Sequence, residues 1–424
     1  MLQWLYFFVY AILVFGGGIY LIKRSPKFAS LRWLLPLLAI KWAVGCLYGW
    51  LFWVKYQGDD TWHYHQLSLE ETKILLERPF FFIADLFQHP YKHSQWTSFF
   101  DSQQSFWKNL QYNILIKLLA VFNVFSKGHY YTNVLFFNLI TIWGHYWLFK
   151  LLIAIVPTAK KHWLIIVCLF PPLLFWQSGI RKDGLIFAAI AATIYFSYLL
   201  VNKGFNKKYF WAALMGFLIV FLLRNATALG LLMPLMVYYV WGNNQHFIKY
   251  VLASFAIGTG LFFATSLGPQ AFNLPLKLAE RQEKFLELTG GSYMYLPPID
   301  GSIFSYAKAL PHALNHVFVR PYLWEGKSFL LLIAAIETAF FWLIVIVSLL
   351  FYRKQLNINL HKKAFVWLLY IAFLNYLIIG FTVPFAGAIV RYRIVFELCW
   401  LLPFWASLPI NDWWLWLQKK AGKQ

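Results

Sequence analysis

Charged residues are scarce in this chain of 424 residues: they make up 12% of it, while 61% of the residues are hydrophobic and 21% are aromatic. A soluble domain carries about 25% charged residues. Apolar runs long enough to cross a bilayer as an α-helix recur from one end of the chain to the other. The composition therefore excludes an ordinary soluble domain and predicts an all-α polytopic membrane protein.

Cysteines are also few, and the short motifs of several enzyme classes are missing. Cys46, Cys168 and Cys399 each lie inside an apolar segment, so neither a disulfide framework nor a CxxC metal site is indicated. The sequence contains no P-loop, no GxSxG nucleophile elbow and no dinucleotide-binding fingerprint. ATP-driven pumping and the cofactor chemistry of soluble enzymes are therefore not supported.

About eleven apolar segments have the length of transmembrane helices. Together they predict one transmembrane domain over residues 1–424. The predicted spans are 2–22, 33–54, 131–155, 163–178, 184–201, 209–223, 226–241, 249–266, 329–351, 364–383 and 394–410.

The orientation of these spans follows from the basic residues, which give the chain a formal net charge of +21. They gather in short loops between apolar segments, and such loops stay on the cytoplasmic side of a membrane. All the clusters fall on one side if the N-terminus is outside and the C-terminus is cytoplasmic. The charge is thus explained by topology and by anionic lipids, and no nucleic-acid partner is predicted. Segment 110–125 is apolar, but counting it as a crossing would reverse every later loop, so we predict a re-entrant or interfacial helix.

Two long loops are predicted on the extracytoplasmic side, at residues 55–109 and 267–328. In the first, Ser68-Leu69-Glu70-Glu71 reads as a capping box that opens a short amphipathic helix ending at Arg78-Pro79. The second contains a charged helical stretch, 278–288, followed by a passage rich in glycine, tyrosine and proline, 290–301. Loops of this length are typical of binding segments, lids or disordered segments.

Polar residues gather on the outer side of this predicted topology. Arginine in short outer loops opposes the positive-inside preference, so either interfacial anchoring and pairing with nearby acids or a shared anionic ligand must keep it there. For the set as a whole we favour a phosphate or pyrophosphate ligand, which suits the planar guanidinium. The candidate ligand-binding residues are Arg181, Lys182, Asp183, Arg224, Arg391 and Arg393, the last two placed before the final span.

The stretch YQGDDTWHYH (56–65) carries the candidate catalytic residues, Asp59 and Asp60. A Gly-Asp-Asp sequence is also ordinary chemistry for a turn at a helix end. Opposite a phosphate-binding cluster, however, these carboxylates can deprotonate a hydroxyl acceptor or bind a divalent cation such as Mg²⁺ or Mn²⁺. His63 and His65 are candidates for substrate binding or for joining a metal site. Glu337 and Glu397, inside predicted spans, are either functional acids or partners of Arg320, Arg391 or Arg393.

Four short motifs, GDDTWHYH, FPPLLFWQSGIRKDGLI (170–186), RPYLWEG (320–326) and GAIVRYR (387–393), together resemble the bacterial multi-spanning glycosyltransferases of the GT-C fold and the related exopolysaccharide or O-antigen polymerases. The resemblance implies a location in the bacterial cytoplasmic membrane. It further implies that Asp59 or Asp60 is the catalytic acid of the site and that Arg181, Lys182, Arg391 and Arg393 bind phosphate. One departure is that the acidic pair follows the second span, whereas the GT-C catalytic loop follows the first.

The sequence therefore predicts a membrane glycosyltransferase or polysaccharide polymerase. It would move a sugar unit from a polyprenyl phosphate or pyrophosphate donor to a glycan or other acceptor at the extracytoplasmic face. The alternative is a transporter or flippase of an anionic lipid-linked substrate, which would need charged sites near the bilayer midplane. The charges identified above gather at one face, which favours chemistry over transport.

Overall fold

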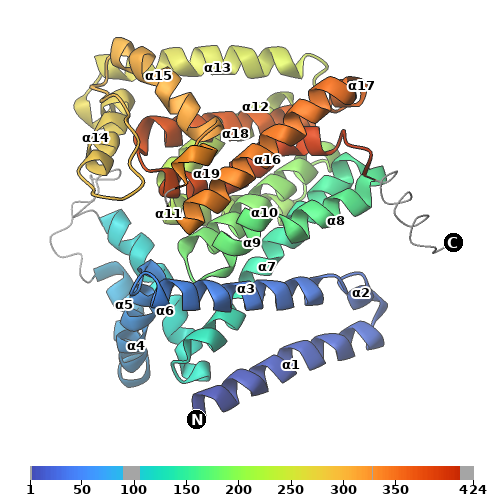
Figure 1. Cartoon of the computed structure of the whole chain (residues 1–424), viewed down its shortest axis with the longest axis vertical. Coiled ribbons are helices and arrows are strands. Elements are labelled where there is room, and N and C mark those ends of the chain that lie inside the picture. Colours follow the sequence, from blue (N-terminus) through green and yellow to red (C-terminus); the bar gives the residue numbers. More distant parts are fainter. Residues whose placement is uncertain (1, 89–105, 327, 411–424) are drawn as a thin grey trace. The chain divides into compact units, whose positions relative to one another are not determined.

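The computed structural model describes residues 2–88, 106–326 and 328–410 (Figure 1). These residues form helices and connecting turns, with a single isolated β-bridge between Tyr293 and Phe385 and no strand among them. The prediction of an all-α protein is confirmed. The α-helices are α1 Leu2–Arg24, α2 Pro26–Ala29, α3 Leu34–Val54, α4 Asp60–Glu77, α5 Pro79–Gln88, α6 Phe106–Ser126, α7 Tyr130–Ile155, α8 Lys160–Leu169, α9 Pro171–Ser178, α10 Lys182–Lys203, α11 Lys207–Leu223, α12 Asn225–Trp241, α13 Phe247–Ala264, α14 Leu274–Leu286, α15 Ile303–Phe318, α16 Phe329–Phe351, α17 Arg353–Leu360, α18 Lys363–Thr382 and α19 Ala386–Trp405.

Seven helices of the described chain are long and apolar enough to cross a membrane. They are α1, α3, α7, α10, α13, α16 and α18, and an eighth span results if α8 and α9, which are bent by 42° at their junction, act as one. Each of the eleven predicted spans lies mostly in helix, but eleven crossings are not confirmed. Helices α11 and α12 have 17 residues each, and α19 contains two arginines and a glutamate.

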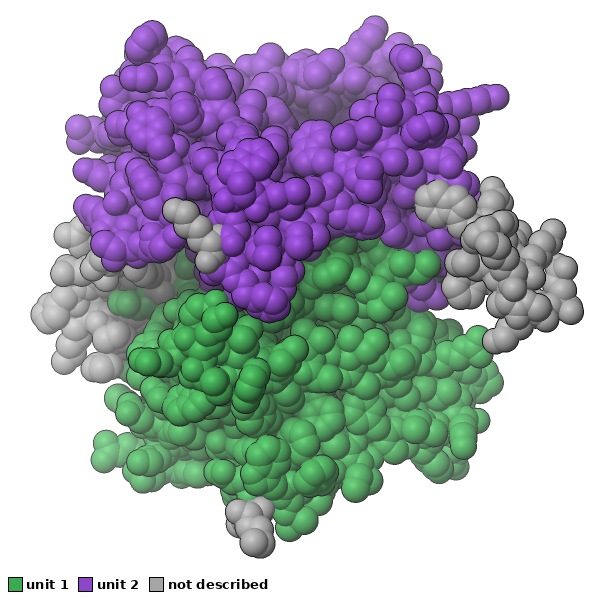
Figure 2. All heavy atoms as spheres, in the orientation of Figure 1, with its two compact units in different colours: residues 1–150, 165–195, 212–224 green, residues 151–164, 196–211, 225–424 purple. Residues whose placement is uncertain are grey.

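The chain divides into two compact units, each built from several stretches of sequence (Figure 2). Unit 1 comprises Met1–Lys150, Ile165–Tyr195 and Ala212–Arg224, and unit 2 comprises Leu151–Leu164, Phe196–Trp211 and Asn225–Gln424. The sequence gives no sign of this division because no linker separates the stretches.

In unit 1, helices α4, α5 and α6 pack against one another beside α3. Their buried residues include Tyr64 of α4 and Leu115 and Leu119 of α6, which cluster with Tyr130 and Phe137 of α7. The predicted first loop, 55–109, includes residues 89–105, which lie outside the described residues; its described part is mostly helical and packed.

Helix α4 begins at Asp60, eight residues before the predicted capping box, so the predicted start at Ser68 is wrong. The Ser68 hydroxyl is buried and donates to the His65 carbonyl inside the helix at 2.6 Å. The predicted end is confirmed, since α4 stops at Glu77 before Arg78-Pro79.

Segment 110–125 belongs to α6, a helix of 21 residues that is not among the seven candidate spans. Lys117, in its middle, is buried and pairs with Glu71 of α4 at 2.8 Å and with Asp85 of α5 at 3.4 Å. These pairs fasten α6 to the helices of the first loop. The re-entrant and the interfacial interpretations of this segment both stay predictions.

In unit 2, α18 is the central helix and packs against α12, α13, α14, α15, α17 and α19. The predicted helical stretch 278–288 is confirmed, because α14 covers most of it and begins at Leu274. Gln282 of α14 fixes the passage that follows: its amide donates to the Pro297 carbonyl at 3.0 Å and accepts from the Ile299 N–H at 2.8 Å. The second long loop is thus also folded.

Candidate functional site

A tight turn after α3 delivers the acidic pair. Gln57 and Gly58 adopt positive φ angles of 52° and 100°, and the Gly58 N–H donates to the Phe52 carbonyl at 3.0 Å. Glycine suits the second position because L-residues rarely adopt such angles. The turn reverses the chain, so that Asp59 stands at the N-cap of α4 and Asp60 is the first residue of that helix.

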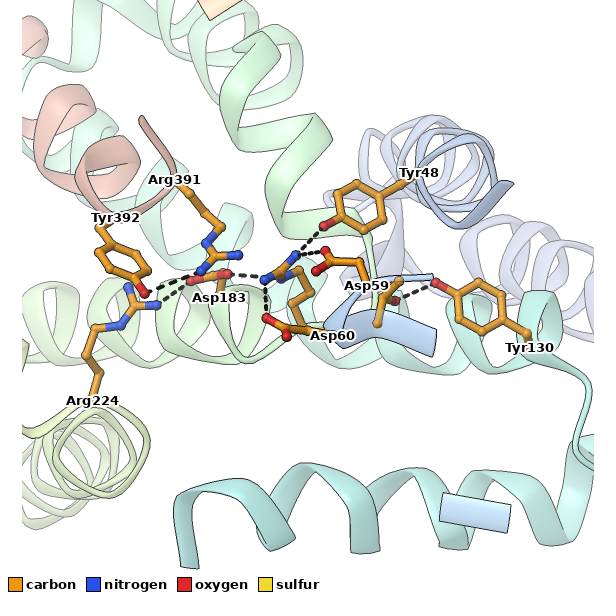
Figure 3. A network of polar contacts seen from close by, with 10 residues as sticks. Tyr48, Asp59, Asp60, Tyr130, Asp183, Arg224, Arg391 and Tyr392 are labelled. Atoms are coloured by element: carbon orange, nitrogen blue, oxygen red, sulfur yellow. Dashed lines mark hydrogen bonds and ion pairs between the residues drawn. The ribbon is translucent and has the colours of Figure 1, made fainter. Parts of the chain in front are cut away.

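The Asp59 carboxylate makes no capping hydrogen bond to α4. It instead accepts a hydrogen bond from Nη1 of Arg181, which also donates to the Tyr48 hydroxyl at 2.8 Å (Figure 3). Nη2 of the same guanidinium donates to Oδ2 of Asp60 at 2.5 Å. Both carboxylates therefore point to one arginine from a distant part of the sequence, and a simple helix-end turn does not account for them.

Arg181 stands in the short turn between α9 and α10, and α3 holds that turn closely. A Cβ atom on Gly179 would lie 2.5 Å from the Tyr48 ring, and one on Gly49 would lie 2.3 Å from the Tyr130 ring. Glycine is needed at Gly179 for this close approach, and not for a special backbone angle, since its φ is −70°. The ring of Tyr130 also stacks on Trp62 with centroids 4.0 Å apart. The turn is thus packed against Tyr48 of α3, and α3 itself is packed against Tyr130.

Asp183 extends the charged cluster at the start of α10. Its Oδ2 lies 3.8 Å from Nε of Arg181, and its Oδ1 lies 2.5 Å from Nη2 of Arg224, which directly follows α11 (Figure 3). Lys182 lies over the Tyr112 ring, with its Nζ 5.5 Å from the ring centroid. The structure therefore brings Asp59, Asp60, Arg181, Asp183 and Arg224 together in unit 1, as the sequence predicts, with Lys182 adjacent.

Exposure is graded across this cluster. The side chains of Arg181 and Asp183 are 5% and 6% exposed, that of Asp59 is 27% exposed and that of Asp60 is 56% exposed. Burial alone would lower the pKa of Arg181, but the surrounding groups, Asp59, Asp183 and Asp60 among them, raise it well above its ordinary value. Arg181 is consequently a permanent buried cation whose one readily accessible partner is Asp60.

The two histidines lie on different sides of α4. His63 is exposed, and its ring centroid is 6.0 Å from that of Tyr112, next to Lys182. His65 is buried against Trp62 and Tyr130, and its Nδ1 has no hydrogen-bond partner. Burial lowers the pKa of His65 to about 4. Of the two, His63 is the one placed beside the charged cluster.

The described residues form no preformed site for a divalent cation. Among the described residues, no group of three or more histidine, cysteine, aspartate or glutamate side chains could hold a metal ion. The guanidinium of Arg181 already bridges Asp59 and Asp60, which are the oxygen ligands that such an ion would need. The site is therefore best described as a carboxylate and guanidinium cluster.

Arg391 and Arg393 belong to unit 2. Helix α19 begins at Ala386, eight residues before the predicted start of the last span, so both arginines lie inside this helix and not in a loop before it. Arg391 contacts its neighbour Tyr392. Arg393 is 1% exposed; its Nη1 donates to the carbonyls of Val317 at 3.0 Å and Arg320 at 2.6 Å.

The remaining contacts of Arg393 give it a structural setting. Its Nη2 donates to the Thr338 hydroxyl at 2.5 Å and pairs with Glu397 at 3.1 Å. Of the partners considered for Glu397, the structure thus shows Arg393, while Arg320 pairs with Glu325 at 2.5 Å. Arg393 holds α15, α16 and α19 together, and because its partners are backbone carbonyls and buried side chains, its geometry does not favour phosphate binding.

Two buried residues of α3 were missed by sequence reasoning. The Tyr48 hydroxyl accepts from Arg181, and Lys41 contacts the end of α9. A signal existed for Lys41, the one charged residue in the predicted span 33–54, since charges inside spans mark functional or structural sites. Tyr48 carries no such signal among the many aromatic residues of the chain.

Comparison with known proteins does not identify a family. Searches of protein-family models, of curated proteins and of solved structures found no match for this chain. Functional inference therefore depends on the geometry of the cluster and on the short motifs that resemble GT-C enzymes.

Proposed function

We propose that this protein is a membrane glycosyltransferase or polysaccharide polymerase whose donor is a sugar linked to polyprenyl phosphate or pyrophosphate. The observation that carries the proposal is the buried guanidinium of Arg181, which is held by the buried Asp183 and by the accessible Asp60. A desolvated, fixed arginine suits the oxygens of a phosphate. A carboxylate next to it suits the removal of a proton from a hydroxyl acceptor.

The roles of the two aspartates differ in this proposal. Asp59 shares Nη1 of Arg181 with Tyr48 and is the less exposed of the pair, so it holds the guanidinium in place. Asp60 contacts Nη2 and is 56% exposed. An incoming phosphate oxygen replaces Asp60 on Nη2, and the released carboxylate then serves as the base. The choice between the two candidate catalytic acids thus falls on Asp60.

The transfer itself needs only groups of this cluster and the two substrates. Asp60 takes the proton of the acceptor hydroxyl, whose oxygen forms a bond to the anomeric carbon of the sugar. The bond between that carbon and the phosphate oxygen breaks, and the phosphate leaves with the electron pair. Arg181 and Arg224 stabilise the charge that develops on the leaving phosphate.

The test is transfer by the purified, reconstituted protein from synthetic polyprenyl-phosphate and polyprenyl-pyrophosphate sugars that carry a radioactive label. Asp60→Asn should lower the rate by about 10²–10⁴-fold, the range for general-base catalysis, with normal membrane insertion. Glu70→Gln is the matched control, because Glu70 is an exposed acid on the same helix. Equal rates for wild type and Asp60→Asn would exclude the catalytic role of Asp60.

A further inference from the structure

Lys41 is a buried charge inside a candidate membrane span. It lies in α3 with no exposed surface, and among the described residues no carboxylate pairs with it. A lysine within the apolar region costs roughly 2.5–3.5 kcal/mol on insertion scales. Such a residue is expected to have a specific partner.

That partner is the C-terminus of α9. Nζ of Lys41 donates to the Gln177 carbonyl at 3.3 Å and to the Ser178 hydroxyl at 3.4 Å. Asn138 of α7 adds a hydrogen bond to the Ser178 carbonyl at 2.9 Å. The last carbonyls of a helix lack partners within the helix, and a cation there is favourable. Lys41 thus supplies two hydrogen bonds where α9 ends inside the helical packing of unit 1.

Two more residues on the same face of α3, Gly45 and Tyr48, contact the chain at and after the end of α9. Positions 41, 45 and 48 lie on one face of the helix because they are four and three residues apart. A Cβ atom on Gly45 would lie 2.4 Å from the Ser178 carbonyl oxygen, so glycine permits the close approach of α9. Tyr48 packs on Gly179 and accepts from Arg181. One face of α3 therefore supports the chain from Gln177 to Arg181.

We infer that Lys41 is a positioning residue for the phosphate site: its hydrogen bonds hold the end of α9 against α3 and thereby fix the guanidinium of Arg181. The inference rests on the proposed function for the ligand of Arg181. The effect of Lys41 on the end of α9 does not depend on that function. An apolar side chain at position 41 would fill the space and leave the end of α9 without its cation. The turn at 179–181 would then loosen, although Asp59 and Asp60 would still be present.

Two measurements test this on the full-length protein in lipid nanodiscs. Lys41→Met should raise the exchange rate of the amide hydrogens of residues 179–184 about tenfold, the effect of losing a charge-assisted hydrogen bond. It should also raise KM for the labelled donor about tenfold and lower kcat by a smaller factor, because Arg181 would hold the phosphate less well in the ground state and stabilise less of the charge on the leaving phosphate. Lys41→Arg keeps a hydrogen-bond donor at this position, so its amide exchange and its KM should lie between those of wild type and Lys41→Met.

A control separates positioning from loss of stability. Leu37, one turn before Lys41 on α3, is 1% exposed and makes only apolar contacts. Leu37→Ala should reduce the amount of active protein, and so the maximal rate, without raising KM. Wild-type exchange at 179–184 in Lys41→Met, or a KM as low as in wild type, would overturn the inference. If no donor is turned over by wild type, faster exchange together with weaker binding of polyprenyl phosphate by Lys41→Met would support the inference and contradict only the proposed transfer reaction.

Discussion

Arg181 in unit 1 and Arg393 in unit 2 are both nearly fully buried, with side chains 5% and 1% exposed, yet they are held in different ways. Arg393 donates to two backbone carbonyls, to a threonine hydroxyl and to Glu397, which lies one turn away on its own helix. Arg181 is surrounded by carboxylates from α4 and α10, and one of them is more than half exposed. Burial and charge are therefore shared by the two residues and do not separate their roles.

The chemical nature of the partners does separate them. A backbone carbonyl cannot leave its arginine without a change in the fold, so the contacts of Arg393 are expected to be permanent. An exposed aspartate such as Asp60 can exchange with an anionic ligand, and the less exposed Asp59 and the buried Asp183 keep the guanidinium in position during the exchange. The comparison predicts that Arg393 supports folding and that Arg181 supports activity.

The largest effect is expected for Arg393→Met. The substitution leaves the carbonyls of Val317 and Arg320 without their donor and Glu397 buried without a cation. Removing one partner of a buried ion pair destabilises a protein by about 3–5 kcal/mol. We expect a strong fall in melting temperature and folded yield in detergent, measured by fluorescence, while the activity per folded molecule stays close to wild type. A stable variant without activity would reverse the assignment.

Arg181→Lys should have the opposite profile. Lysine keeps the positive charge among Asp59, Asp60 and Asp183, so the protein should still fold. It lacks the fork that contacts both Asp59 and Asp60 and, in the proposal, the phosphate. Loss of such a donor costs about 10²–10³-fold in turnover. Arg393→Lys serves as the matched exchange, and equal activity losses in both variants would remove the contrast between the two arginines.

A smaller effect is expected for Asp59→Asn. Asp59 and Tyr48 share Nη1 of Arg181, and an asparagine oxygen still accepts a hydrogen bond there. The loss of the negative charge at position 59 should shift the guanidinium of Arg181 and raise KM for the donor by about tenfold, which corresponds to about 1.4 kcal/mol. The loss of turnover expected for Asp60→Asn should not occur. Steady-state rates for both variants, prepared side by side, test the division of roles. A larger loss of turnover in Asp59→Asn than in Asp60→Asn would exchange the roles.

The sequence predicts the helices of this protein well because each apolar run must form its own backbone hydrogen bonds in a membrane. It also predicts the meeting of Asp59 and Asp60 with Arg181, since the topology derived from basic loops puts them on one side. It puts Arg391 and Arg393 in a loop before the last span, whereas both lie inside α19. In the structure, α15 supplies the carbonyls of Val317 and Arg320 to Arg393, and contacts so distant in sequence leave no local pattern. Lys41 shows the same limit, because the end of α9 lies far along the chain.

The smallest effect concerns His65, which is buried beside the acidic pair but not part of it. Its lowered pKa, about 4, means that the folded protein resists protonation of this ring, while the unfolded chain takes up the proton near pH 6.5. Its contribution to stability is therefore fully present above pH 6.5 and is lost as the pH falls from there towards 4. The melting temperature of His65→Phe minus that of wild type should therefore be a few degrees larger at pH 4.5 than at pH 7.5. The exposed His63 provides the control: His63→Gln should follow the wild-type pH profile, and a flattened profile in that variant instead would assign the pH response to the charged cluster.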